Sequence, residues 1–156
     1  MFEKVKEAIM WRANGSQVSD YRHFENGESG YVSDIAVLAM LGISEDIPGC
    51  GVTTITYADH QAAVYIVNNS FLELPLDIQK AGLAHEEGHV SLNHLSKARW
   101  YTTILRFFHE PEYEYEADAY AVKKVGKLPM IDLLNIYKEI NCRGIDKRIE
   151  RIRKMS

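Results

Sequence analysis

The chain has 156 residues, of which 46% are hydrophobic and 26% charged, with a net charge of −4 and two cysteines. This length and composition fit one folded domain over residues 1–156 and argue against a disordered chain. The slightly acidic charge gives no reason to expect a nucleic-acid or membrane partner, and two distant cysteines argue against a disulfide scaffold or a thiolate metal site.

The first part of the chain predicts helices and loops. Residues 2–12 read as an amphipathic helix without the apolar core of a signal peptide, so a cytoplasmic location is expected. Residues 16–30 are polar and contain glycine, which predicts a loop. Ser33 and Asp34 can cap a short apolar helix through Leu41, with Gly42 as its end. No apolar run is long enough to span a bilayer.

Two runs rich in Val, Ile, Thr and Tyr follow, over residues 52–57 and 62–68, and they predict an antiparallel hairpin. Beyond them the apolar spacing predicts helices over residues 77–95, 96–109, 111–125, 129–140 and 145–155. The basic residues over 143–154 are interrupted by Asp146 and Glu150, which favours a solvated helix face over a phosphate-binding patch. The predicted fold class is α+β, mostly helical, with a small antiparallel sheet.

The helix predicted over residues 77–95 carries the motif His85-Glu86-Glu87-Gly88-His89. Side chains four residues apart share one helix face, with Cβ atoms about 5–6 Å apart, so His85 and His89 can bind one metal ion. Glu86 then lies where its carboxylate can act as a base toward a water at the open coordination position. The motif predicts a zinc site, and the alternative is an exposed face that carries two histidines by chance.

Such a site needs a third protein ligand. A metzincin would have a histidine six residues after the second ligand, where this chain has Leu95. His94 is one residue short of that position, and we interpret it as a surface or packing histidine. Glu114 and Asp118 are stronger candidates because they lie four residues apart on one predicted helix. One can bind the metal, and the other can accept a hydrogen bond from a ligand histidine.

Two segments together resemble the gluzincin metallopeptidases, namely Leu-Ala-His-Glu-Glu-Gly-His over 83–89 and Glu-Tyr-Glu-Ala-Asp-Ala-Tyr-Ala over 114–121. The ImmA/IrrE peptidases are similar in the apolar strand that ends at Asn68 and in the Leu-Ala-His-Glu entry into the helix. The HtpX-type peptidases are similar in Glu-Ala-Asp-Ala-Tyr-Ala and in Asp-Lys-Arg-Ile over 146–149, so a minimal HtpX-like protein without membrane helices is the other branch that fits. The resemblance covers about residues 62–150.

The resemblance implies a zincin-like domain whose metal-site core spans about residues 62–126. In those families a Glu-x-x-Ala-Asp helix supplies the third ligand, which implies Glu114 as that ligand and Asp118 as the outer partner of a ligand histidine. Glu112 and Glu116 then have no place at the metal. Glu87 stands where these families more often have Leu or Ile.

The expected reaction is peptide-bond hydrolysis by a zinc-activated water, with Glu86 as the general base that later protonates the leaving amine. The developing oxyanion needs a further donor. The candidates are His109, Tyr113, Tyr101 and Arg148, and packing or solvation is an alternative role for each. Cys50 is interpreted as a turn cysteine rather than a fourth zinc ligand.

The expected partner is a protein or peptide substrate, cleaved with restricted specificity, and a small amide is a second substrate class. The strand over Ala62–Asn68 could present a free edge to an extended peptide, although a covered strand is an equal alternative. A different function is also open, a non-catalytic regulatory or binding module that reuses a zincin fold. The presence of Glu86 weighs against that module, because a structural site needs no base.

Overall fold

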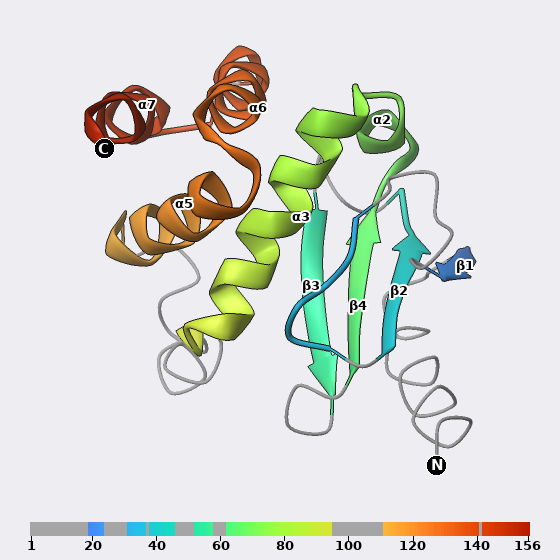
Figure 1. The fold of residues 1–156 in the computed structure, drawn as a ribbon. Helices are drawn as coiled ribbons and strands as arrows, with labels where there is room; N and C mark the ends of the chain where they lie inside the picture. Colours follow the sequence, from blue (N-terminus) through green and yellow to red (C-terminus); the bar gives the residue numbers. More distant parts are fainter. Residues whose placement is uncertain are drawn as a thin grey trace, which may run out of the picture.

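The structure, a computed structural model, describes residues 19–23, 31–36, 38–45, 52–57, 62–94, 111–140 and 142–156. Its strands are β1 (Asp20–His23), β2 (Leu38–Ile43), β3 (Val52–Tyr57) and β4 (Ala62–Val67), and its helices are α2 (Asn69–Leu72), α3 (Leu76–Ser91), α5 (Pro111–Val125), α6 (Lys127–Glu139) and α7 (Ile145–Lys154). Helix α3 lies between the sheet and the group formed by α5, α6 and α7 (Figure 1). The described residues therefore form an α+β arrangement that is mostly helical, as predicted.

The four strands form one mixed sheet in the order β1-β2-β4-β3. β3 and β4 pair antiparallel, with Val52 opposite Val67 and Tyr57 opposite Ala62, which confirms the predicted hairpin. β2 pairs parallel with β4, so the prediction of a purely antiparallel sheet is wrong. β4 is also hydrogen-bonded on both edges. Of the two alternatives for Ala62–Asn68, a free edge or a covered strand, the structure shows the covered strand, so a peptide cannot add along β4.

The apolar run before the hairpin forms strand β2 rather than the helix predicted from Ser33 to Leu41. A short apolar run does not distinguish a buried strand from a buried helix. β2 is apolar along its length because it lies between β1 and β4, and Gly42 is a strand residue opposite Ile66 rather than a helix end. β1, within the segment predicted as a loop, and the single turn α2 were not predicted.

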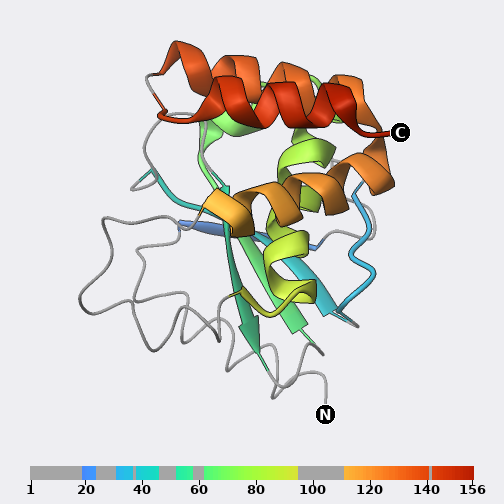
Figure 2. The same cartoon turned by 90° about the vertical axis from the view of Figure 1, so that its left-hand side faces the viewer.

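Four predicted helices are confirmed as α3, α5, α6 and α7, with ends that differ by a few residues. The predicted helices over 2–12 and 96–109 lie outside the described residues. Alternate residues of β4, Ala63, Tyr65 and Val67, pack into the main core with all four helices. Helices α6 and α7 run side by side above α5 (Figure 2). No helix among the described residues is long and apolar enough to cross a membrane.

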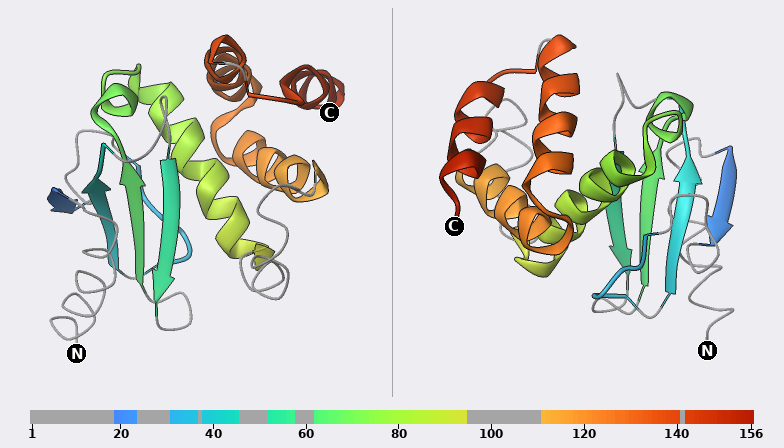
Figure 3. Two further views of the ribbon diagram at one scale, coloured as in Figure 1. Left: turned by 180° about the vertical axis from the view of Figure 1, so that it is seen from behind. Right: turned by 45° about the horizontal axis from the view of Figure 1, so that its top comes forward.

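Helices α3 and α5 approach closely at Gly88, and Figure 3 shows this pair from two further directions. A Cβ atom at Gly88 would lie 3.0 Å from Cβ of Tyr120 and 3.1 Å from Cα of Ala117. Ala117 and Ala121 are completely buried, as expected for small residues at a close crossing. The absence of a side chain at Gly88 thus lets α5 bring its carboxylates up to the histidines of α3.

Candidate metal centre

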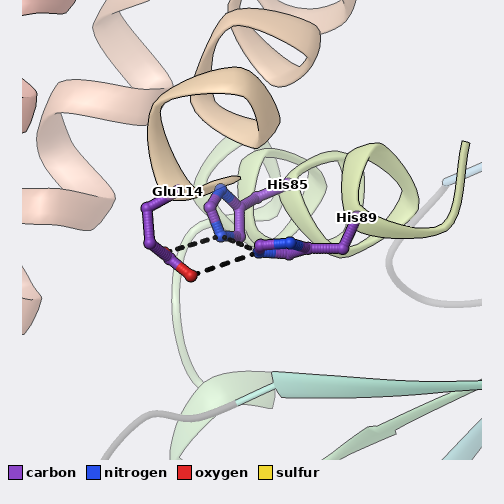
Figure 4. A group of neighbouring side chains, drawn as sticks. All are labelled: His85, His89 and Glu114. Atoms are coloured by element: carbon purple, nitrogen blue, oxygen red, sulfur yellow. Dashed lines mark hydrogen bonds and ion pairs between the residues drawn. The ribbon is translucent and has the colours of Figure 1, made fainter. Parts of the chain in front are cut away.

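Two histidines of α3 and one glutamate of α5 converge on a single point (Figure 4). The Nε2 atoms of His85 and His89 lie 3.0 Å apart. Glu114 places Oε2 3.3 Å from Nε2 of His85 and Oε1 3.4 Å from Nε2 of His89. These ligand atoms lie within 4.8 Å of one another, so the group could hold a metal ion. Two imidazoles and one carboxylate fit a divalent metal such as zinc.

Asp118 lies one turn after Glu114 on α5 and is 1% exposed. Its Oδ1 lies 2.9 Å from Nδ1 of His85, close enough for an ion pair although the ring N–H is not aligned for a hydrogen bond. Asp118 therefore contacts the ring nitrogen that faces away from the point of convergence. This is where an outer carboxylate orients a ligand histidine.

Arg148 of α7 is engaged by both carboxylates of α5. It donates from Nε and Nη2 to Asp118 at 2.7 and 2.6 Å, and its Nη1 lies 3.0 Å from Oε2 of Glu114. Paired N–H donors of this kind fix a carboxylate in orientation as well as in place. The geometry thus favours a role for Arg148 in holding Glu114 and Asp118 over the expected role of oxyanion donor.

In the absence of a metal, attraction between the basic and acidic side chains of the centre stabilises their charged forms. Burial lowers the pKa of His85, but the contacts with Asp118 and Glu114 outweigh it and raise that pKa to about 9. Burial raises the pKa of Glu114, but the hydrogen bond with His85 and the charges of His85 and Arg148 more than compensate and hold that pKa well below its usual range. Asp118 behaves in the same way, and Arg148 and His85 lower its pKa. In the metal-free protein these contacts therefore favour the protonated form of His85, and a metal ion would have to displace a proton from that ring.

We expect the metal-free protein to be most stable between pH 4.5 and 6.5. The raised pKa of His85 contributes stability that is full below 6.5 and is lost as the pH rises toward 9. The lowered pKa values of Glu114 and Asp118 contribute stability that is lost as the pH falls below 4.5 for Glu114 and below 3.8 for Asp118. Thermal melting of metal-free protein from pH 4 to 9 measures this profile. The decline above pH 6.5 should be absent in His85→Gln, and the same decline in both proteins would contradict the assignment.

Of the other predicted site residues, the structure describes Glu86, Tyr113 and Glu112 but not His109, Tyr101 or Cys50. Glu86 is half-buried on α3, directly after the first histidine, and it interacts with neighbouring groups. Tyr113 stacks its ring on His94, with the ring centroids 4.5 Å apart. His109, Tyr101 and Cys50 lie outside the described residues. Glu112 is not among the converging ligand atoms. Its side chain is 69% exposed, and its Oε1 lies 3.7 Å from Nη1 of Arg151.

Two further residues lie beside His89. His94 is 2% exposed and therefore a packing rather than a surface histidine, but its Nδ1 also lies 3.0 Å from Nδ1 of His89, a contact that the sequence does not predict. Glu116 is not among the converging ligand atoms, as expected, and its Oε2 lies 2.8 Å from Nε2 of His94. The available signal was a third histidine close to the motif together with a further acid on α5.

A second buried group surrounds Glu87, which is completely buried on α3. We define the Glu87 cluster as Glu87, Tyr31, Tyr65, Tyr120 and Lys124. Glu87 accepts hydrogen bonds from Tyr31 at 2.6 Å, Tyr120 at 2.5 Å and Lys124 at 2.9 Å, with Tyr65 at 3.4 Å. Burial and the charge of Glu87 raise the pKa values of all three tyrosines, which therefore remain donors. The cluster joins α3 to α5, β4 and the segment at Tyr31.

A scan against protein-family models and searches of curated proteins and of solved structures found no match. The function of this site is therefore inferred from the chain's own residues.

Proposed function

We propose that the chain is a zinc-dependent peptidase, with His85, His89 and Glu114 as metal ligands and Glu86 as the general base. The observation that carries this proposal is the convergence of the three ligand atoms from two helices within 4.8 Å. Two histidines and a glutamate are the ligand set of known catalytic zinc sites, which keep a fourth position open. The resemblance of both helices to gluzincin motifs supports the same assignment.

Zinc held by these side chains would supply Lewis acidity at the open position. The carboxylate of Glu86 takes a proton from the attacking water and delivers it to the leaving nitrogen. Asp118 holds His85 from its outer side, and Arg148 holds Asp118 and Glu114 in place. These contacts fix the ligands before substrate arrives, which is the preorganisation that such a site needs.

The proposed substrate is an extended peptide segment that pairs with β3. β4 cannot accept it, because both edges of β4 are already paired. β3 is the last strand in the order of the described sheet, and it lies on the side toward α5 (Figure 1). An added strand would gain main-chain hydrogen bonds that do not depend on sequence. Recognition of this kind favours a protein or peptide over a small amide.

The test is digestion of a diverse peptide library by zinc-loaded protein, with new termini identified by mass spectrometry. We expect cleavage that a chelator abolishes and that added zinc restores. A protein that binds zinc but cleaves nothing in the library or in an unfolded protein mixture would overturn the proposal and favour a binding module. Cleavage that is unaffected by chelation would also contradict it.

A further inference from the structure

The outer side of His89 is occupied by a chain of two further side chains. Nδ1 of His89 lies 3.0 Å from Nδ1 of His94, and Nε2 of His94 lies 2.8 Å from Oε2 of Glu116. Tyr113 stacks on the His94 ring at an interplanar angle of 18°. The His94 side chain is 3% exposed, whereas that of Glu116 is 54% exposed. A buried imidazole therefore links His89 to a carboxylate at the surface.

The way in which α3 ends explains why His94 lies beside His89. The helix ends at Ser91, and Asn93 follows with φ at 59°, in the left-handed region that asparagine tolerates better than most residues. The N–H groups of Leu92 and Asn93 donate to the carbonyls of Gly88 and Val90. A helix continued past residue 91 would place His94 about 140° around the axis from His89. The reversal at Asn93 instead brings His94 alongside His89.

One arrangement of protons along these contacts leaves Nε2 of His89 free to bind a metal. The carboxylate of Glu116 can only accept, so Nε2 of His94 carries a proton and donates it. A neutral His94 then has a lone pair on Nδ1, which accepts from an N–H on Nδ1 of His89. Nε2 of His89 is left without a proton, and this is the atom that faces His85 and Glu114.

We propose that His94, held by Glu116 and Tyr113, is a positioning residue that fixes His89 with Nε2 presented to the metal. Asp118 has the corresponding place behind His85, so each histidine ligand has its own outer partner, a carboxylate for one and an imidazole linked to a carboxylate for the other. This inference rests on the proposed metal site and adds residues that neither the motif nor the resemblance assigns. Outer partners of ligand histidines typically change metal affinity 10–100-fold when they are lost.

The first test is zinc affinity, measured by competition with a chromophoric chelator. His94→Phe keeps a ring for Tyr113 to stack on and removes both nitrogens, and we expect zinc to bind about 10–100-fold more weakly. Glu116→Ala should weaken binding in the same direction by a smaller factor. Glu116→Gln should restore affinity, because its amide oxygen still accepts from Nε2 of His94. Glu112→Ala, an exposed glutamate on the same helix, is the matched control and should bind zinc as the wild type does.

The second test observes the ring directly by ¹⁵N NMR of metal-free protein with labelled histidines. We expect the wild type to carry the His89 proton on Nδ1, and His94→Phe to lose this preference while its melting temperature stays close to that of the wild type. If His94→Phe were to unfold, Glu116→Ala would still decide the question, because that side chain lies at the surface.

Two results would overturn the inference while leaving the metal site intact. One is wild-type zinc affinity in His94→Phe and Glu116→Ala, and the other is a His89 proton on Nε2 in the wild type. A wild-type protein that binds no zinc would overturn the proposed function itself. The two failures are therefore distinguishable.

Discussion

Replacing Glu86 with glutamine is expected to lower kcat/KM for peptide hydrolysis by about 10²–10⁴-fold, the usual contribution of a positioned general base. Glutamine has nearly the same size and keeps an acceptor oxygen, but it cannot take a proton from water at neutral pH. Zinc content should stay at the wild-type level, because Glu86 is not among the converging ligand atoms. Steady-state kinetics on a peptide identified from the library, together with metal analysis, measure both quantities.

The control for Glu86→Gln is Glu112→Gln, which makes the same chemical change at an exposed position. It should leave both kcat/KM and zinc content unchanged. Hydrolysis by Glu86→Gln within a few-fold of the wild type would contradict the role of Glu86. A parallel loss of zinc and activity would show that Glu86 acts on metal binding rather than on the chemical step.

Glu87, next to Glu86 in the chain, is expected to matter for stability rather than for catalysis. Glu87→Ala is expected to lower the free energy of unfolding by about 3–5 kcal/mol, because buried donors that lose their acceptor cost about 1–3 kcal/mol each and a cavity adds to this. The change leaves the hydroxyls of Tyr31 and Tyr120 without their acceptor, whereas Lys124 keeps its ion pair with Asp34. Chemical denaturation of metal-free protein measures the loss.

A control variant and a rescue variant test whether the loss of stability comes from the buried charge of Glu87. Glu139→Ala, an exposed acid at the end of α6, should change stability by less than about 0.5 kcal/mol. Combining Glu87→Leu with Lys124→Met should recover part of the loss, because an apolar pair of similar size replaces the buried charges. A loss below about 1 kcal/mol in Glu87→Ala would show that the cluster does not anchor α3.

The side chains that could hold a metal ion were predictable from sequence because helix periodicity brings their candidates onto shared faces. His85 and His89 share a face of α3 at a spacing of four residues, and Glu114 and Asp118 do so on α5. Gly88, Ala117 and Ala121 lie where α3 and α5 cross closely. Glu114 and Asp118 were then separated only by the resemblance to gluzincins, and their contacts with His85 agree with that separation.

The sheet was less predictable because pairing joins residues that are distant in the chain. An apolar run at 35–41 fits a helix or an interior strand equally well, and only its parallel pairing with β4 decides between them. The edge status of β4 likewise depends on β2, which pairs with it across the sheet. A local residue pattern therefore predicts neither the strand at β2 nor the paired edges of β4.

The contacts behind His89 were not predictable for a different reason. The helix predicted over 77–95 continues past residue 91, but α3 ends at Ser91 and the left-handed Asn93 redirects the chain. Glu116 contacts His94 only because of this change of direction. The sequence does not explain Glu87 in its motif, because its tyrosine and lysine partners come from three separate segments, the one at Tyr31, β4 and α5.

Zinc stoichiometry with single ligand substitutions tests the central claim most directly. We predict one zinc ion per wild-type chain after dialysis against buffered zinc, and loss of that zinc in His85→Ala, His89→Ala and Glu114→Ala. Glu112→Ala, on the same helix as Glu114, should retain it. Wild-type protein that gains no zinc, or Glu114→Ala that binds zinc as tightly as the wild type, would contradict the proposed metal centre.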